Sequence, residues 1–204
     1  QLINDIKHTV NPDYTGEYGW FANKWAAQLG FKSYDVFNIE GLDLFTELNL
    51  ARPYTYSHVY PEQNYSHALQ PLAHPLGANF VESVSGVSYL GKRIIADVKL
   101  MYAILGIDTT GTHFGQNIFN PTMDGNQGYD YIVNSYGNVI LQGIRTEAIT
   151  AKLDFGYILW ENKNLSLNAG VIFRSIKPEI QARRNYTYVF FGIKSNFLKR
   201  EMVY

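Results

Sequence analysis

Residues 147–159, EAITAKLDFGYIL, decide the fold because apolar and polar side chains alternate along the whole stretch. The apolar positions are Ile149, Ala151, Leu153, Phe155, Tyr157 and Leu159, and between them lie Thr150, Lys152 and Asp154. A period of two residues predicts a β-strand with one apolar and one polar face. Strands of soluble proteins average about 5–6 residues, whereas a strand that crosses a bilayer needs about 9–11. The length of this stretch therefore favours a membrane-spanning strand.

The same alternation predicts seven strands along the chain. They cover residues 23–33, 39–52, 79–90, 92–106, 144–160, 163–176 and 185–198. Besides the first stretch, the lipid-facing candidates are Leu42–Leu50, Ile94–Ile104, Leu165–Phe173 and Val189–Phe197. The facing of residues 79–90 stays open because serines occur at both odd and even positions.

Charged residues of these strands are expected on the less apolar face. They are Asp43, Glu47, Asp97, Lys99, Lys152, Asp154, Arg174 and Lys194. In a barrel lumen such side chains are hydrated or paired, whereas on the lipid face each would be costly. On a soluble sandwich they would simply be solvated, so the charges alone do not separate the two folds.

Connection lengths supply an independent signal. Short turns are expected around residues 33–35, 91–92 and 161–164, and longer connections cover 53–78, 107–143 and 176–184. Gly91 favours a type II′ hairpin. Short and long connections alternate, so the long ones gather at one end of the sheet, as in outer-membrane barrels with short periplasmic turns and long extracellular loops.

These patterns predict an all-β fold, a transmembrane antiparallel up-and-down β-barrel in the cell outer membrane. We expect residues 1–204 to form a single barrel domain, with 1–22 as the end of an extracellular loop. Because bacterial single-chain barrels have an even strand number, an odd count predicts that the chain holds the C-terminal strands of a larger barrel.

Aromatic residues near the predicted strand ends suggest interfacial girdles. They are Trp25, Tyr102, Tyr157, Trp160, Tyr186 and Tyr188. Amphipathic rings gather at the two membrane–water interfaces of such barrels. The alternative is the ordinary preference of aromatic residues for strands.

Composition excludes several classes of protein. The 204 residues carry a net charge of -1, which gives no basic footprint for nucleic acid. The chain contains no cysteine, so disulfides and thiolate ligands are excluded. No apolar run reaches the length of a spanning helix.

The first long connection holds the candidate ligand-binding residues. They are Arg52, Tyr54, Tyr56, His58, Tyr60, Asn64, Tyr65, His67 and His74. This set of side chains suits a sugar ligand, because sugars stack on aromatic rings and hydrogen-bond to planar amide or guanidinium groups. The alternative is that the tyrosines fold the loop over the barrel mouth.

Neither metal nor catalysis is expected in this loop. The spacings of the three histidines match no tight ligand motif, and backbone hydrogen bonds explain them equally well. Ser57-His58 and Ser66-His67 are adjacent in sequence, which does not supply the base and orienting acid that a nucleophile needs in space. We predict a non-enzymatic protein without a cofactor.

Particular phrases of the chain carry a family resemblance. They are ARPYTYSH (51–58, with Ala51 first), NYSH (64–67), QPLAHPLGANF (70–80), FGQNIF (114–119), GYDY (128–131) and YVFFGIK (188–194). Together they resemble the gliding-motility RemB-like and Wzi-like capsule-assembly outer-membrane proteins of Bacteroidota. The resemblance spans about residues 20–200.

This resemblance implies a non-enzymatic barrel for surface polysaccharide assembly or attachment, or for gliding-motility machinery. The expected partners are outer-membrane lipid, surface polysaccharide and other outer-membrane, motility or secretion proteins, with no nucleic acid. Two alternatives stay open: a protein-binding scaffold subunit of a secretion or motility complex, and a soluble all-β binding domain.

Overall fold

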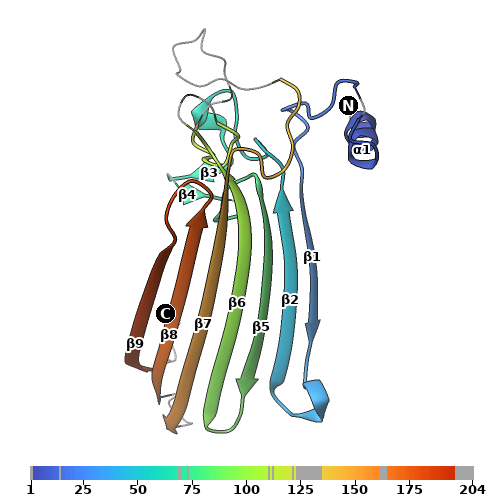
Figure 1. The fold of residues 1–204 in the computed structure, drawn as a ribbon. Coiled ribbons are helices and arrows are strands. Elements are labelled where there is room, and N and C mark those ends of the chain that lie inside the picture. Colours follow the sequence, from blue (N-terminus) through green and yellow to red (C-terminus); the bar gives the residue numbers. More distant parts are fainter. Residues whose placement is uncertain are drawn as a thin grey trace, which may run out of the picture.

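The computed structural model describes residues 2–13, 15–68, 70–72, 74–109, 111, 113–120, 122, 135–160 and 165–195. Its main feature is a 7-stranded antiparallel sheet in the order β1-β2-β5-β6-β7-β8-β9 (Figure 1). The strands are β1 (Ala26–Ser33), β2 (Leu42–Ala51), β5 (Phe80–Leu90), β6 (Ile94–Ile107), β7 (Ile144–Trp160), β8 (Leu165–Pro178) and β9 (Arg184–Lys194). The all-β class, the antiparallel order and the predicted strands are confirmed within the described residues. Residues 163–164 and 196–198 of the predicted strands, the predicted turn at 161–164 and the phrase at 128–131 lie outside the described residues.

The smaller elements were not predicted. They are α1 (Leu2–Val10), the 3-10 turns η1 (Val36–Asn38) and η2 (Pro61–Gln63), and the two-residue strands β3 (Ser66–His67) and β4 (Gln70–Pro71). The helix α1 falls within residues 1–22, for which only a loop was expected. Among the described residues, no helix is long and apolar enough to cross a bilayer.

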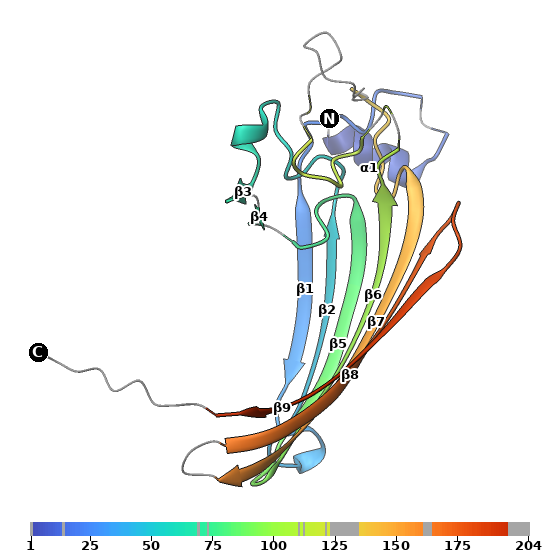
Figure 2. The ribbon, with the colours of Figure 1, turned by 90° about the vertical axis from the view of Figure 1, so that its left-hand side faces the viewer.

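The strand register places the apolar side chains on one face. One row across six neighbouring strands, for example, consists of Leu44, Val87, Val98, Leu153, Val171 and Val189. The sheet is strongly curved (Figure 2), and this apolar face is its convex side. The predicted lipid-facing positions within the described strands therefore share one face.

The charged side chains share the concave face. Asp43 lies in one row with Ser88, Asp97 and Asp154, and the next row brings Lys99 beside Lys152. Glu47 and Arg174 share a third row of the same face, and alternation along β8 adds Lys194 beside Ser166. The predicted facing of the charges is confirmed.

The open question about β5 is resolved by its burial. Phe80, Glu82 and Val84 are buried on the concave face, while Ser83 and Ser85 point to the convex face. There the Ser85 hydroxyl lies 2.8 Å from the Thr46 hydroxyl across the strand pair, so the two share one hydrogen bond. A hydrogen-bonded pair reduces the cost of a polar group on an apolar face.

Two local predictions are wrong. Gly91 donates its N–H to Ile94 O at 2.8 Å and does not have a positive φ, so it closes the turn and is not its first central residue. A type II′ turn needs φ above zero at that central residue. Tyr186 and Tyr188 lie beside Arg174 and Ile172 on the concave face, so they do not belong to an interfacial girdle.

Buried apolar side chains are concentrated at one end of the sheet. Ala51, Phe80, Ala103 and Leu105 form the cluster, with Tyr56, Leu76, Ile107 and Ala148 packed against it. This end is where the long connections cross the sheet (Figure 1). The rest of the sheet carries no second layer within the described residues, and its convex face stays uncovered.

Candidate functional site

The long connections form a cap at one end of the strands, and the short turns lie at the opposite end (Figure 1). Here "cap" means residues 52–79 together with the described residues of 108–143. This separation of long and short connections agrees with the expected arrangement. The cap folds through buried polar contacts, which position its exposed side chains.

Tyr54 is the central anchor of the cap. Its side chain is fully buried, and its hydroxyl donates to His113 O at 2.8 Å. The Tyr54 N–H donates to Phe114 O at 3.0 Å, so both of its donors bind the second long connection. At Gly115 an added Cβ would lie 2.5 Å from the Cα of Tyr54. The two connections therefore meet at backbone contact.

Arg52 is a second anchor. Its guanidinium donates to Asn23 O at 2.6 Å and to Asn138 O at 3.1 Å, and lies 3.4 Å from the Asp5 carboxylate. Burial lowers the pKa of Arg52, and the Asp5 charge partly opposes that shift. The side chain thus joins the N-terminal residues to both long connections.

Asn79 is a third anchor, which sequence patterns did not indicate. It is fully buried with φ of 60°. Its amide nitrogen donates to Gly106 O and Gln142 O, each at 2.8 Å, and its amide oxygen accepts from Leu141 N at 2.7 Å. An asparagine tolerates this left-handed backbone and supplies both donors and an acceptor.

The segment from His58 to Asn64 forms a compact turn. Asn64 Oδ1 accepts from the His58 N–H at 2.6 Å, and His58 Nδ1 accepts from the Tyr60 N–H at 3.3 Å. Asn64 is buried, whereas Tyr60 is about half exposed at 52%. The turn presents the Tyr60 ring to solvent.

Two tyrosine rings stack beside this turn. Tyr56 and Tyr65 have ring centroids 6.2 Å apart at an interplanar angle of 27°. Burial, followed by the neighbouring Tyr65, raises the pKa of Tyr56 above its ordinary value. Tyr65 is exposed, as is His67, which pairs with Gln70 in the β3–β4 ribbon.

A hollow of about 250 Å³ lies between the cap and the concave face of the sheet. It is lined by Ala26, Ala27, Gln28, Asn49, Leu50, Tyr56, His74 and Phe80. The rings come mainly from the cap side, and the amides of Gln28 and Asn49 come from the sheet. Sugars can stack their C–H faces on aromatic rings and hydrogen-bond through their hydroxyls to planar amides, so rings together with amides suit such ligands.

His74 and Glu82 hold one wall of this hollow. His74 Nε2 lies 2.9 Å from Glu82 Oε2, and its ring packs against Phe80 at 4.4 Å. The Asn49 amide donates to the same carboxylate oxygen at 3.1 Å. Glu82 is almost fully buried, and its Oε1 has no hydrogen-bond partner within the described part of the chain. A buried polar atom without a partner is costly, and the contacts of Oε2 with His74 and Asn49 are what hold this carboxylate in place.

The structure thus divides the predicted site residues into four groups. Tyr56 and His74 line the hollow, while Tyr60, Tyr65 and His67 are exposed elsewhere on the cap. His58 is half-buried in its turn. The remaining candidates, Arg52, Tyr54 and Asn64, are buried and hold the cap together, as in the alternative that the loop folds over the sheet.

Sequence patterns missed the residues that the sheet contributes to the hollow. Gln28, Asn49 and Phe80 lie on β1, β2 and β5, and only the strand register brings them together near His74. Alternation could indicate their face but not their neighbours. His58, His67 and His74 do not converge, and no group of three metal-ligating side chains lies together within the described residues.

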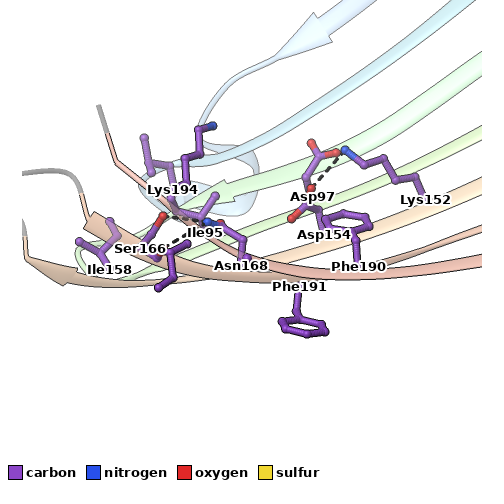
Figure 3. A pocket seen from close by; sticks show the side chains of 13 residues that line it. Ile95, Asp97, Lys152, Asp154, Ile158, Ser166, Asn168, Phe190, Phe191 and Lys194 are labelled. Carbon is purple, nitrogen blue, oxygen red and sulfur yellow. Dashed lines mark hydrogen bonds and ion pairs between the residues drawn. The ribbon is translucent and has the colours of Figure 1, made fainter. Parts of the chain in front are cut away.

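A second hollow, of about 610 Å³, lies on the concave face toward the short turns (Figure 3). Lys152 and Asp154 form an ion pair there at 3.2 Å, with Asp97 in the same row as Asp154. Figure 3 shows Phe190 pointing into the hollow and Phe191 pointing away from it, to the convex side. The concave face here therefore mixes charged and amide side chains with apolar ones such as Ile95, Ile158 and Phe190.

Comparison with known proteins adds no relative. No family model, no curated protein and no solved structure matches the chain.

Proposed function

We propose that the sheet is part of the wall of a transmembrane β-barrel in the outer membrane, and that the cap handles cell-surface polysaccharide without catalysis. The observation that carries the proposal is the uncovered apolar face. Its exposed large side chains are Leu29, Phe31, Leu48, Val87, Ile94, Val98, Leu100, Tyr102, Ile149, Leu153, Phe155, Tyr157, Leu167, Phe173, Val189, Phe191 and Ile193. Soluble monomers rarely expose a contiguous apolar patch beyond a few hundred Å².

The size of the apolar band supports a bilayer as its cover. Between Ile94 and Ile104 the outward positions of β6 are Ile94, Ala96, Val98, Leu100, Tyr102 and Ile104. At about 3.3 Å per residue and a tilt of roughly 40°, this run spans about 25 Å along the membrane normal. That height equals the apolar band of outer-membrane barrels, about 25 Å.

The concave face supports a lumen. The ion pair and the amide groups of this face would be hydrated in a water-filled lumen at little cost. The alternative, a soluble sandwich, would need a second sheet packed on the convex face. The exposed edges of β1 and β9 are where further strands would complete the wall. Inside a bilayer each unpaired backbone group costs several kcal/mol, so both edges need neighbours.

The hollow beneath the cap supports polysaccharide as the ligand. Tyr56 and His74 offer ring surface, and Gln28 and Asn49 offer amide groups. The exposed Tyr60 and Tyr65 extend the aromatic surface outward. The resemblance of the cap phrases to capsule-assembly and gliding proteins agrees with a role in surface polysaccharide or surface motility.

The membrane proposal is tested by the gel mobility of the intact protein from a washed outer-membrane fraction. A folded barrel runs faster when unheated and slows after boiling. Recovery in the soluble fraction, with no change on boiling, would overturn the proposal and leave the soluble all-β domain.

The ligand proposal is tested by binding capsule polysaccharide from the producing cells to the intact protein in detergent. Gln28→Ala removes one amide from the hollow and should weaken binding about threefold to tenfold, the effect of one hydrogen bond. Gln63→Ala, an exposed amide outside the hollow, is the matched control. Equal affinities for the two variants would argue against the hollow, and no binding by the unaltered protein would argue against this ligand.

A further inference from the structure

The helix α1 turns its polar side toward the protein and its apolar side outward, the reverse of a usual surface helix. Its sequence, LINDIKHTV, is amphipathic, with the polar residues Asn4, Asp5, His8 and Thr9 on one side. Asp5 accepts from Gly19 N at 2.7 Å and from Asn23 Nδ2 at 2.8 Å, and it pairs with Arg52. The polar side therefore fixes α1 to the protein.

Two further contacts fix the same side. Asn4 Nδ2 donates to Glu17 O at 2.9 Å. The His8 ring stacks on Tyr18, with centroids 3.6 Å apart and an angle of 13° between the planes. Together with Asp5 these contacts set the rotation of the helix about its axis.

The opposite side is apolar and uncovered. Ile3, Ile6 and Val10 follow the spacing i, i+3, i+7, and 66%, 56% and 80% of their surfaces are exposed. A surface helix of a soluble protein turns its apolar side to the core. The reversed arrangement calls for an apolar environment outside the protein.

The position of α1 indicates which environment that is. Figures 1 and 2 together place it beside β1, at the cap end and on the convex side of the sheet. A hollow of about 290 Å³ beside α1 is lined by the apolar residues Ile6, Trp25, Val139 and Ile140 and also by polar residues, among them Asp5, His8, Thr9 and Arg52. Trp25 precedes β1 in phase with Ala27 and Leu29 of the convex face. The apolar side of the helix thus continues the apolar face of the sheet.

We infer that α1 is an interfacial helix that lies on the membrane beside the barrel, with Ile3, Ile6 and Val10 in the lipid. This inference rests on the proposed membrane function. Continuity with the convex face favours lipid over a protein partner or a second copy. Lys7 lies at the margin of the apolar arc, where a lysine stem can cover apolar surface and its ammonium can reach lipid head-group phosphates.

The test uses the absence of cysteine from the chain, which makes single-site labelling clean. The intact protein is prepared with Ile3→Cys, Thr9→Cys or Leu153→Cys and labelled with a nitrobenzoxadiazole fluorophore. Each form is reconstituted into phosphatidylcholine–phosphatidylglycerol vesicles that contain doxyl-labelled phosphatidylcholine. Thr9, on the polar side of the same helix, is the matched control, and Leu153 reports the barrel wall.

We expect lipid quenching at Ile3 to exceed that at Thr9 by about twofold or more, as for a helix lying in the interface. Quenching at Leu153 but not at Ile3 would overturn the inference and leave the barrel standing. Quenching at none of the three sites would overturn the proposed membrane function. Equal quenching at Ile3 and Thr9 would contradict the orientation of the helix.

Discussion

The Tyr56 side chain has two roles in the cap, one in packing and one in lining the hollow. Its ring packs against the core at the end of the sheet and also lines the hollow. Its stacked neighbour, Tyr65, is exposed. A change at Tyr56 therefore affects both the stability of the cap and the surface that a ligand would meet.

The raised pKa of Tyr56 gives a pH dependence with a definite sign. The folded cap favours the neutral phenol, so this contribution to stability is fully present below the ordinary pKa of about 10. It is lost as the pH rises through the higher folded-state value. In absorbance titrations, the difference between the unaltered protein and Tyr56→Phe should rise only above pH of about 10. A difference that titrates at or below the ordinary value would refute the burial effect.

Gly170 shows how one missing Cβ shapes the concave face. An added Cβ would lie 2.4 Å from the Phe190 ring and 2.6 Å from Leu153 O. The ring can turn away, but the backbone carbonyl is fixed in the sheet. The same arrangement recurs at Gly86, where the ring of Phe45 covers the glycine.

Gly170→Ala should therefore destabilise the sheet by about 1–3 kcal/mol, as overpacking does. Gly192→Ala is the control, because an added Cβ there meets nothing within 4 Å. Urea unfolding of both variants in detergent measures the difference. Equal loss at the two glycines would mean that the close approach of Phe190 does not matter.

At the scale of elements, β7 is the strand whose two faces are most clearly distinguished. Leu153 lies in the convex row with Val98 and Val171, and Thr150 lies in a concave row with Met101 and Arg174. If the convex face meets lipid, Leu153→Arg places a charge near the middle of the bilayer. At Thr150 the same kind of change meets a polar environment.

Leu153→Arg should cost about 2–4 kcal/mol in lipid vesicles, and Thr150→Gln should change little. The free energy of unfolding, measured by urea titration of the reconstituted protein, gives both values. Similar losses at the two positions would contradict the assignment of the convex face to lipid and the concave face to the lumen.

How far the sequence predicts these elements depends on whether their signal is local. The period of two residues lies within each strand, so the boundaries of β6 and β7 and the facing of Asp97 and Lys152 follow from it. The contact of His74 with Glu82 depends on the path of a long connection, and no period encodes it. The helix α1 was missed because it is short and lies among polar loop residues.

At the scale of the whole molecule, the two ends of the sheet differ in kind. One end carries the cap, and the other carries short turns such as Lys92-Arg93 (Figure 1). In the proposed barrel the cap is extracellular and the turns are periplasmic. This proposal gives the protein one orientation in the membrane, which can be tested by antibody access from outside the cell.

An epitope tag inserted after Gln63 should be stained on intact cells, and one inserted after Lys92 only after permeabilisation. Both positions are exposed or half-exposed, outside long strands, and tolerate insertion better than strand residues. Staining of the Lys92 tag on intact cells, without staining of the Gln63 tag, would show the opposite orientation.

The anchors of the cap also determine when the cap can fold. Asn79 binds Gly106 and Gln142, which are 27 and 63 residues away in the chain. Loop-closure entropy makes such distant contacts costly until something else brings the segments together. Pairing of β5 with β6 and of β6 with β7 does this. We therefore expect the strands to pair before the cap folds. A protease added to newly made chains should cut the cap at first and fail to cut it later, and the delay would measure how long the cap takes to fold after the strands have paired.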